Sequence, residues 1–287
     1  MKFFAYSFIL ILVTIIACNA PNFTRMQRMP ASLRESSGIL TYNGSTVWTH
    51  NDSGGDPTLY EIDVQSGGLL RIVTLAGVKN IDWEDITKDE RGNVFIGDFG
   101  NNHQNRKNLC IYKIENPQPL AASATVLSER IGFSYADQQK FPPSAKTQNF
   151  DCEAFVYYRD SLYLFTKNHS RPYTGYTKMY RLPAVEGDYV AELVDSFKTG
   201  ATAATTFITS AAISPNGKQL ALLSSDKVFL FSNWKGANFF QGDLRRIPLG
   251  TLSQKEAICF STNWTLWIGD ERTGKMIGGN IYSFDLR

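Results

Sequence analysis

The sequence predicts an all-β fold, a β-propeller in which five blades of four antiparallel strands surround a central channel. Three observations predict it. Five segments repeat one plan of strand, polar turn and strand. Their turns contain the Asn, Asp and Gly of β-hairpins, and the flanking runs are rich in Val, Ile, Phe, Tyr and Trp. With 287 residues, the chain is long enough for one large domain of this kind.

Each repeated segment begins with a small or acidic residue. Nine or ten residues separate that position from the start of the second strand in all five, and successive segments begin about 45 to 70 residues apart. This spacing is typical of propeller blades. The segments are SGILTYNGSTVWTHN from Ser37, EDITKDERGNVFIGD from Glu84, EAFVYYRDSLYLFT from Glu153, AAISPNGKQLALLS from Ala211 and EAICFSTNWTLWIGD from Glu256.

Third and fourth strands follow the repeated segments. Third strands are predicted at 58–64, 109–115, 178–184, 227–233 and 280–286, and fourth strands at 69–77, 128–135, 191–197 and 244–250. The last blade has no fourth strand after it, so residues 22–33 are expected to supply one and remove the open edge. Two alternatives remain open: a six-bladed propeller, with an irregular blade within 121–150, and a β-sandwich.

The N-terminus indicates export. Residues 3–17, FFAYSFILILVTIIA, form an uncharged apolar run with the length of a signal-peptide core, and Cys18 follows them. The tetrad IIAC resembles a bacterial lipobox, which implies lipidation of Cys18. We therefore expect a lipoprotein signal peptide at 1–17, a lipidated Cys and tether at 18–24, and one propeller domain at 25–287. An N-terminal membrane anchor and an ordinary secretory signal are the alternatives. The expected location is membrane-anchored, in the periplasm or at the cell surface.

Charge and cysteine content exclude several classes of protein. Lys and Arg number 29 against 27 Asp and Glu, so nothing indicates a nucleic-acid partner. Cys110, Cys152 and Cys259 match no zinc spacing, and their odd number favours buried thiols over a disulfide framework. Nothing indicates an obligate oligomer, and a monomer is expected.

The repeat predicts where polar residues gather. In a propeller, residues that begin first strands and residues that end second strands meet on one face near the axis. The first set is Ser37, Glu84, Glu153, Ala211 and Glu256, and the second is Asn51, Asp98, Thr166, Ser224 and Asp270. Neighbouring loops add polar residues to this face: His50, Asp52, Asn101, Asn102, His103, Lys167, Asn168, His169 and Glu271.

Crowded carboxylates repel one another unless a cation, a proton or hydrogen bonds compensate them. Ca²⁺ takes six to eight oxygen ligands, which this face can supply. The expected cofactor is therefore a divalent cation, and Ca²⁺ suits these ligands best. Zinc or iron would use more imidazole, and His50, His103 and His169 keep that alternative open. A further alternative is that the glutamates only fasten neighbouring blades through hydrogen bonds.

The motifs SSGI, WTHNDSGG, DWEDI, IGDFGNN, EAF and LWIGDE resemble those of exported bacterial β-propeller proteins. They are distantly similar to phytase-like and esterase-like propellers and to the gluconolactonase and regucalcin group. In those families, acidic residues hold calcium or another divalent ion in the channel. The resemblance implies that role for Glu84, Asp98, Glu153, Glu256 and Asp270. The chain departs from the pattern at Ser37 and Ala211.

Two functions follow as hypotheses. In the first, the cation polarises a phosphoryl or ester oxygen, which gives a metal-dependent hydrolase of the phosphoesterase or lactonase class. Lys167 and Arg171 would then meet an anionic substrate, and His50 or His169 would act as acid or base. In the second, the protein is a non-catalytic module that binds a sugar, peptide or other small ligand at its channel mouth.

Overall fold

A computed structural model describes residues 23–272 and 277–287. The predicted signal peptide 1–17, Cys18 and most of the tether lie outside the described residues. Across the ranges that are described, no helix has both the length and the apolar character needed to cross a membrane.

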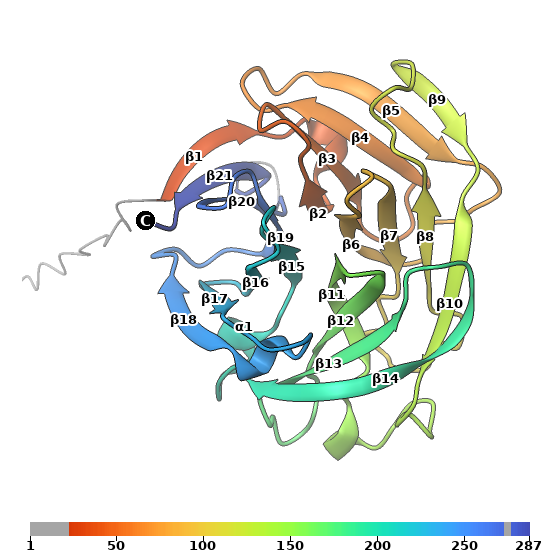
Figure 1. Cartoon of the computed structure of the whole chain (residues 1–287), viewed down its shortest axis with the longest axis vertical. Coiled ribbons are helices and arrows are strands. Elements are labelled where there is room, and N and C mark those ends of the chain that lie inside the picture. Colours follow the sequence, from red (N-terminus) through yellow and green to blue (C-terminus); the bar gives the residue numbers. More distant parts are fainter. Residues whose placement is uncertain (1–22, 273–276) are drawn as a thin grey trace, which may run out of the picture.

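The described chain folds into sheets arranged radially around a common axis (Figure 1). One sheet has the order β2-β3-β4-β5-β9, with β9 parallel to β5. Its strands are β2 (Ser36–Leu40), β3 (Thr46–Asn51), β4 (Thr58–Asp63), β5 (Leu69–Leu75) and β9 (Ser123–Val126). A second sheet, β15-β16-β17-β18, contains β15 (Ser210–Ile213), β16 (Gln219–Leu223), β17 (Lys227–Ser232) and β18 (Asp243–Pro248).

The largest sheet has eight strands, and it consists of two four-stranded halves joined edge to edge. One half is β6 (Trp83–Lys88), β7 (Val94–Asp98), β8 (Cys110–Ile114) and β10 (Glu129–Tyr135). The other is β11 (Asp151–Tyr158), β12 (Ser161–Lys167), β13 (Tyr176–Pro183) and β14 (Gly187–Lys198). The halves join because β10 pairs with β14 in parallel.

The remaining sheet is closed by the first described strand. Its order is β1-β21-β20-β19, with β1 (Phe23–Arg28), β21 (Asn280–Asp285), β20 (Thr265–Asp270) and β19 (Lys255–Phe260). The predicted closure by residues 22–33 is therefore confirmed. The helices are short: η1 (Ala31–Leu33), η2 (Ala145–Thr147), α1 (Ala203–Thr206) and η3 (Phe239–Gln241).

The predicted first strands line the axis. The innermost strands β2, β6, β11, β15 and β19 contact one another in that cyclic order, and β19 contacts β2 to close the ring. This is the radial arrangement of a β-propeller, as predicted. In the segment 121–150, β9 and β10 extend the sheets of β5 and β8, and the described residues there form no further sheet.

Hydrogen bonds across the axis hold the ring of inner strands together. Asp85 in β6 is fully buried. Its carboxylate accepts the backbone N–H of Phe155 in the neighbouring strand β11 at 3.2 Å and that of Ala211 in β15, across the axis, at 3.1 Å. It also accepts the hydroxyl of Ser210, which in turn accepts the N–H of Ile258 in β19. Burial raises the pKa of Asp85 well above its usual value, and these four accepted bonds, including one from Ile86, oppose that rise. Asp85 therefore fastens inner strands instead of capping a loop.

Apolar side chains fill the space between sheets. Trp48 and Trp267 are buried, each in a cluster whose members come from two of the repeats, so both pack between repeats. Cys110, Cys152 and Cys259 are free and buried, as predicted.

Candidate functional site

Carboxylates converge on a cavity of about 160 Å³ at the end of the axis where the inner strands begin. Glu84, Glu153 and Glu256, which the repeat predicted to meet, all line it. The full lining is Glu35, Ser36, Ser37, Asp52, Glu84, Asn102, Glu153, Lys167, Gln254, Glu256 and Glu271. The set contains six carboxylates and one ammonium group. We call this cavity the acidic mouth.

A β-bulge at the start of each contributing strand places these glutamates. The register shifts between Trp83 and Ile86, between Cys152 and Ala154, and between Lys255 and Ala257, so that Glu84, Glu153 and Glu256 each sit at the irregularity. A bulge re-aims side chains that regular pairing would point elsewhere. Strand β15 pairs regularly through Ala211, and that strand contributes no carboxylate.

Three carboxylates form the tightest group in the described residues. Ligand oxygens of Asp52, Asp82 and Glu84 all lie within 4.8 Å of one another, so this triad could hold a metal ion. Asp52 directly follows β3, and the other two residues flank the start of β6. Gly100 leaves the triad room, because a Cβ at that position would overlap Glu84 Oε1 and Asp82 Cγ. Any side chain at position 100 would therefore disturb the triad.

Burial and mutual repulsion make these carboxyl groups poor acids. Burial, with Glu153, Asp52 and Asp151 nearby, raises the pKa of Glu84 well above its usual value. Burial and then Asp52 raise the pKa of Asp82 to about 6. The pKa of Glu256 rises to about 7, again chiefly through burial. Such a cluster favours protons or a cation in its centre.

Lys167 compensates one side of the acidic mouth. Its Nζ lies 2.9 Å from Glu153 Oε1. Burial lowers the pKa of Lys167, but the carboxylates of Glu153, Asp151 and Glu256 outweigh it and raise the pKa overall. Within the described ranges, no Lys or Arg forms an ion pair with Asp52, Asp82 or Glu84. Two members of the triad, Asp52 and Glu84, line the mouth. The positive charges of Lys167 and Arg106 only partly oppose the rise in the pKa of Asp52 and of Asp82, respectively.

The two second-strand aspartates predicted as metal ligands do not line this cavity. Asp98 is fully buried, 2.7 Å from Arg106 Nη2, and accepts the N–H groups of Ile81 and Asp82. Asp270 accepts the N–H of Asn280 at 2.8 Å and the hydroxyl of Tyr282 at 2.9 Å. Both oxygens of each residue are thus used in fastening strand ends.

The three predicted catalytic residues have different positions. Lys167 lines the acidic mouth, whereas His50 is fully buried behind it, with Nδ1 2.9 Å from the carbonyl of Asn51. Burial lowers the pKa of His50 to about 4. His169 is half-buried, and its Nε2 lies 2.7 Å from Asp151 Oδ2.

Asp151 is a candidate site residue that the repeat pattern missed. It is fully buried, and its second oxygen accepts the N–H of Asn101 at 2.6 Å. A carboxylate at Nε2 favours the tautomer with that nitrogen protonated, which leaves Nδ1 of His169 as an acceptor. Asp151 also helps to raise the pKa of Glu84 and Asp82, so the dyad lies within electrostatic reach of the triad. Its position two residues before Glu153 was the available signal.

Next to the dyad is a second hollow, of about 540 Å³. His103, His169 and Arg171 are among its lining residues, and Asn102 lines both this hollow and the acidic mouth. The mouth and the dyad are therefore parts of one continuous surface.

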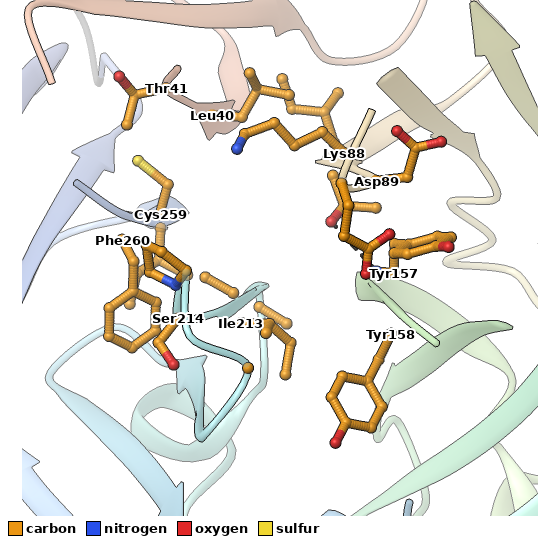
Figure 2. A pocket seen from close by; sticks show the side chains of 18 of the residues that line it. Leu40, Thr41, Lys88, Asp89, Tyr157, Tyr158, Ile213, Ser214, Cys259 and Phe260 are labelled. Atoms are coloured by element: carbon orange, nitrogen blue, oxygen red, sulfur yellow. Dashed lines mark hydrogen bonds between the residues drawn. The ribbon is translucent and has the colours of Figure 1, made fainter. Parts of the chain in front are cut away.

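A larger cavity, of about 380 Å³, opens at the opposite end of the inner strands. Figure 2 shows Lys88, Tyr157, Tyr158, Ser214 and Cys259 around it. Burial raises the pKa of Cys259 to about 12, so this thiol is not a nucleophile at neutral pH. No converging carboxylates like those of the acidic mouth line this end among the described residues.

Solved structures share the fold at low sequence identity. No family model and no curated protein matches the chain. The PQQ-bound aldose sugar dehydrogenase of Streptomyces coelicolor is similar with a TM-score of 0.53 and 8% identity, over 92% of this chain and 97% of that one. The Swd1 β-propeller domain of Myceliophteria thermophila gives 0.44 and 11%, over 92% and 100%. The likeness to the dehydrogenase shows the fold alone, which agrees with the propeller predicted from the repeat.

Proposed function

We propose that the chain is an exported, lipid-anchored monomer with a five-bladed propeller whose acidic mouth binds a divalent cation and hydrolyses esters. The five-blade count treats the eight-stranded sheet as two blades, because it contains two of the five inner strands, β6 and β11. The observation that carries the function is the triad Asp52, Asp82 and Glu84 beside the Asp151–His169 dyad.

The donor set suits a hard cation. All three triad residues offer carboxylate oxygens, which favours Ca²⁺ over zinc or iron. Glu153 is already bonded to Lys167, so we assign it and Glu256 to the surroundings of the cation and not to its inner ligands. A bound divalent cation would polarise the carbonyl oxygen of an ester.

The dyad can move the proton that hydrolysis requires. Nδ1 of His169 accepts a proton from a water molecule as the water oxygen bonds to the acyl carbon of the ester. The bond from that carbon to the alkoxy oxygen then breaks, and the same proton passes to the leaving oxygen, which gives an acid and an alcohol. Asp151 holds the ring and stabilises its transient positive charge, because it is buried and accepts from Nε2.

The cofactor of the similar dehydrogenase does not fit this mouth. PQQ carries several carboxylates of its own, whereas the six carboxylates here face one ammonium group that is already paired with Glu153. We therefore propose no quinone chemistry for this chain.

Metal analysis of the exported domain, with thermal melts in Ca²⁺ and in chelator, tests the cation site. We expect bound Ca²⁺ and a melting temperature that falls in chelator. A neutral ester panel then tests turnover. Turnover should be lost in His169→Asn and in Asp82→Asn, and only the second variant should lose Ca²⁺. A metal-free protein whose melting ignores both additions would disprove the cation site. Ca²⁺ binding without turnover of any ester would favour the non-catalytic binding module.

A further inference from the structure

A third hollow adjoins the acidic mouth. Its volume is about 420 Å³, and it shares Lys167, Gln254 and Glu256 with the mouth. Its other lining residues are Ala204, Phe207, Thr209, Ser225, Leu252, Ser253 and Lys255. A ligand group in this hollow would therefore touch the same residues as a group in the mouth.

The exposed wall of this hollow is apolar. The Leu252 side chain is 68% exposed at its rim, and Phe207 is half-buried. The Phe207 ring centroid lies 5.4 Å from that of His169, and Lys167 Nζ lies 5.7 Å from the ring. Phe207 therefore lies between the hollow, which it lines, and the dyad, which it contacts through His169. An apolar hollow that opens onto a polar site is typical of a ligand subsite.

The Lys255 ammonium group has no hydrogen-bond donor left for a ligand in this hollow. It is fully buried, and its Nζ donates to the carbonyls of Ser225 at 2.8 Å and Thr251 at 3.1 Å and to the Ser253 hydroxyl at 3.1 Å. Its three protons are therefore used inside the wall.

The charge of the acidic mouth favours a neutral carboxylic ester over a phosphate ester as the substrate. Six carboxyl groups line the mouth, some of which burial keeps protonated, beside one ammonium group that Glu153 already engages. This lining offers an anionic ester group no free cationic side chain. A phosphate monoester carries up to two negative charges and would be repelled. A neutral carboxylic ester carries none.

Resting on the proposed hydrolase, we infer that the substrate is a neutral carboxylic ester, cyclic or open, whose apolar group occupies the hollow of Phe207 and Leu252. Its carbonyl lies in the acidic mouth, so the apolar group extends past Lys167. Affinity should rise with the length of that group until the hollow is filled, by about fourfold for each buried CH₂.

The test uses the Ca²⁺-loaded domain and two readouts. Calorimetry compares neutral n-alkyl amides of increasing length, which are not hydrolysed under the assay conditions, with the matched alkanoates. We expect affinity to rise with amide length and the alkanoates to bind at least about tenfold more weakly. Turnover of the corresponding neutral alkyl esters, beside alkyl phosphates, gives the second readout, with the same length dependence in kcat/KM.

Variants test whether the dependence on chain length arises in the hollow of Phe207 and Leu252. Leu252→Ser and Phe207→Ala should flatten the dependence on length, and the exposed position of Leu252 makes its variant safe for folding. Leu127→Ser is the matched control, because Leu127 is 84% exposed and lines a hollow elsewhere, and its profile should equal that of the parent protein.

Amide affinity independent of length, or alkanoates that bind as tightly as amides, would overturn the inference even if esters are hydrolysed. If amide binding depends on length and Leu252→Ser abolishes that dependence, the subsite is supported. If no ester is turned over in the same experiments, the proposed hydrolase fails while the subsite stands.

Discussion

Cation binding at the acidic mouth should weaken as pH falls, because the cation competes with protons for the triad. The pKa of Asp82 is raised to about 6, mainly by burial, and that of Glu84 is raised well above its usual value. Below these values the carboxyl groups are protonated, and each must lose its proton before it can bind a cation. Asp82 alone predicts a Kd for Ca²⁺ about tenfold larger at pH 5 than at pH 7. If Glu84 titrates in the same range, the factor rises toward about a hundredfold.

Calorimetric titration with Ca²⁺ between about pH 5 and about pH 8 measures this dependence. In two buffers of different ionisation enthalpy, the same titrations count the protons released. The Asp82→Asn variant should bind Ca²⁺ more weakly at neutral pH. The ratio of its Kd at pH 5 to its Kd at pH 7 should be about tenfold smaller than in the parent protein. Asp188→Asn, an exposed carboxylate paired with Arg130, should behave like the parent protein. A Kd that does not change across this pH range, with no proton released, would refute the reasoning.

Three further predictions concern stability and reactivity. The cation-free protein should become less stable as pH rises from about 4 to about 7. The pKa values of Asp82, Glu256 and Glu271 are raised in the folded state, so the folded state binds more protons than the unfolded state in this range. Chemical denaturation in the presence of chelator at several pH values measures this loss of stability. Asp85→Ala leaves the N–H groups of two neighbouring strands without a buried acceptor, so the free energy of unfolding should fall by about 2–6 kcal/mol, against less than about 1 kcal/mol for Asp188→Ala. Thiol reagents should label Cys259 only after denaturation, since that residue is buried with a pKa of about 12; rapid labelling of the native protein would contradict its placement.

The repeat made most of the fold predictable. Strand positions follow from alternating side chains and turn residues, which are local signals, and all five predicted first strands line the axis. The closure by β1 could also be predicted, because a missing fourth strand leaves an edge that must be paired. The parallel pairing of β10 with β14 could not, since it joins two outer edges that no repeat relates.

The site was only partly predictable, because bulges decide where side chains point. Equal spacing brought Glu84, Glu153 and Glu256 to one cavity. The repeat treated Asp98 and Asp270 as their equals, yet hydrogen bonds with Arg106 and Tyr282 engage them away from it. Those partners come from loops and third strands outside the repeated segments.

The repeat did not identify Asp82 and Asp151 as site residues. They occupy the residue before β6 and the first position of β11, whereas Asp52, which was expected on this face, follows β3. Asp82 and Asp151 lie beside the mouth at irregular ends of strands, which alternation along a strand cannot reveal. Asp85 is adjacent to Glu84 in sequence, yet the bulge sends its side chain into the bonds across the axis.

The pairing of β1 with β21 also sets the order in which the protein can be completed during synthesis. Strand β1 is made before all other described strands, and its partner is made after them. Until β21 emerges from the ribosome, β1 has an unpaired edge and the ring of inner strands stays open. The mouth needs Asp52 from the first sheet and Glu256 from the last, so a nascent or truncated chain presents only part of it. Cation binding would thus distinguish finished molecules from unfinished ones.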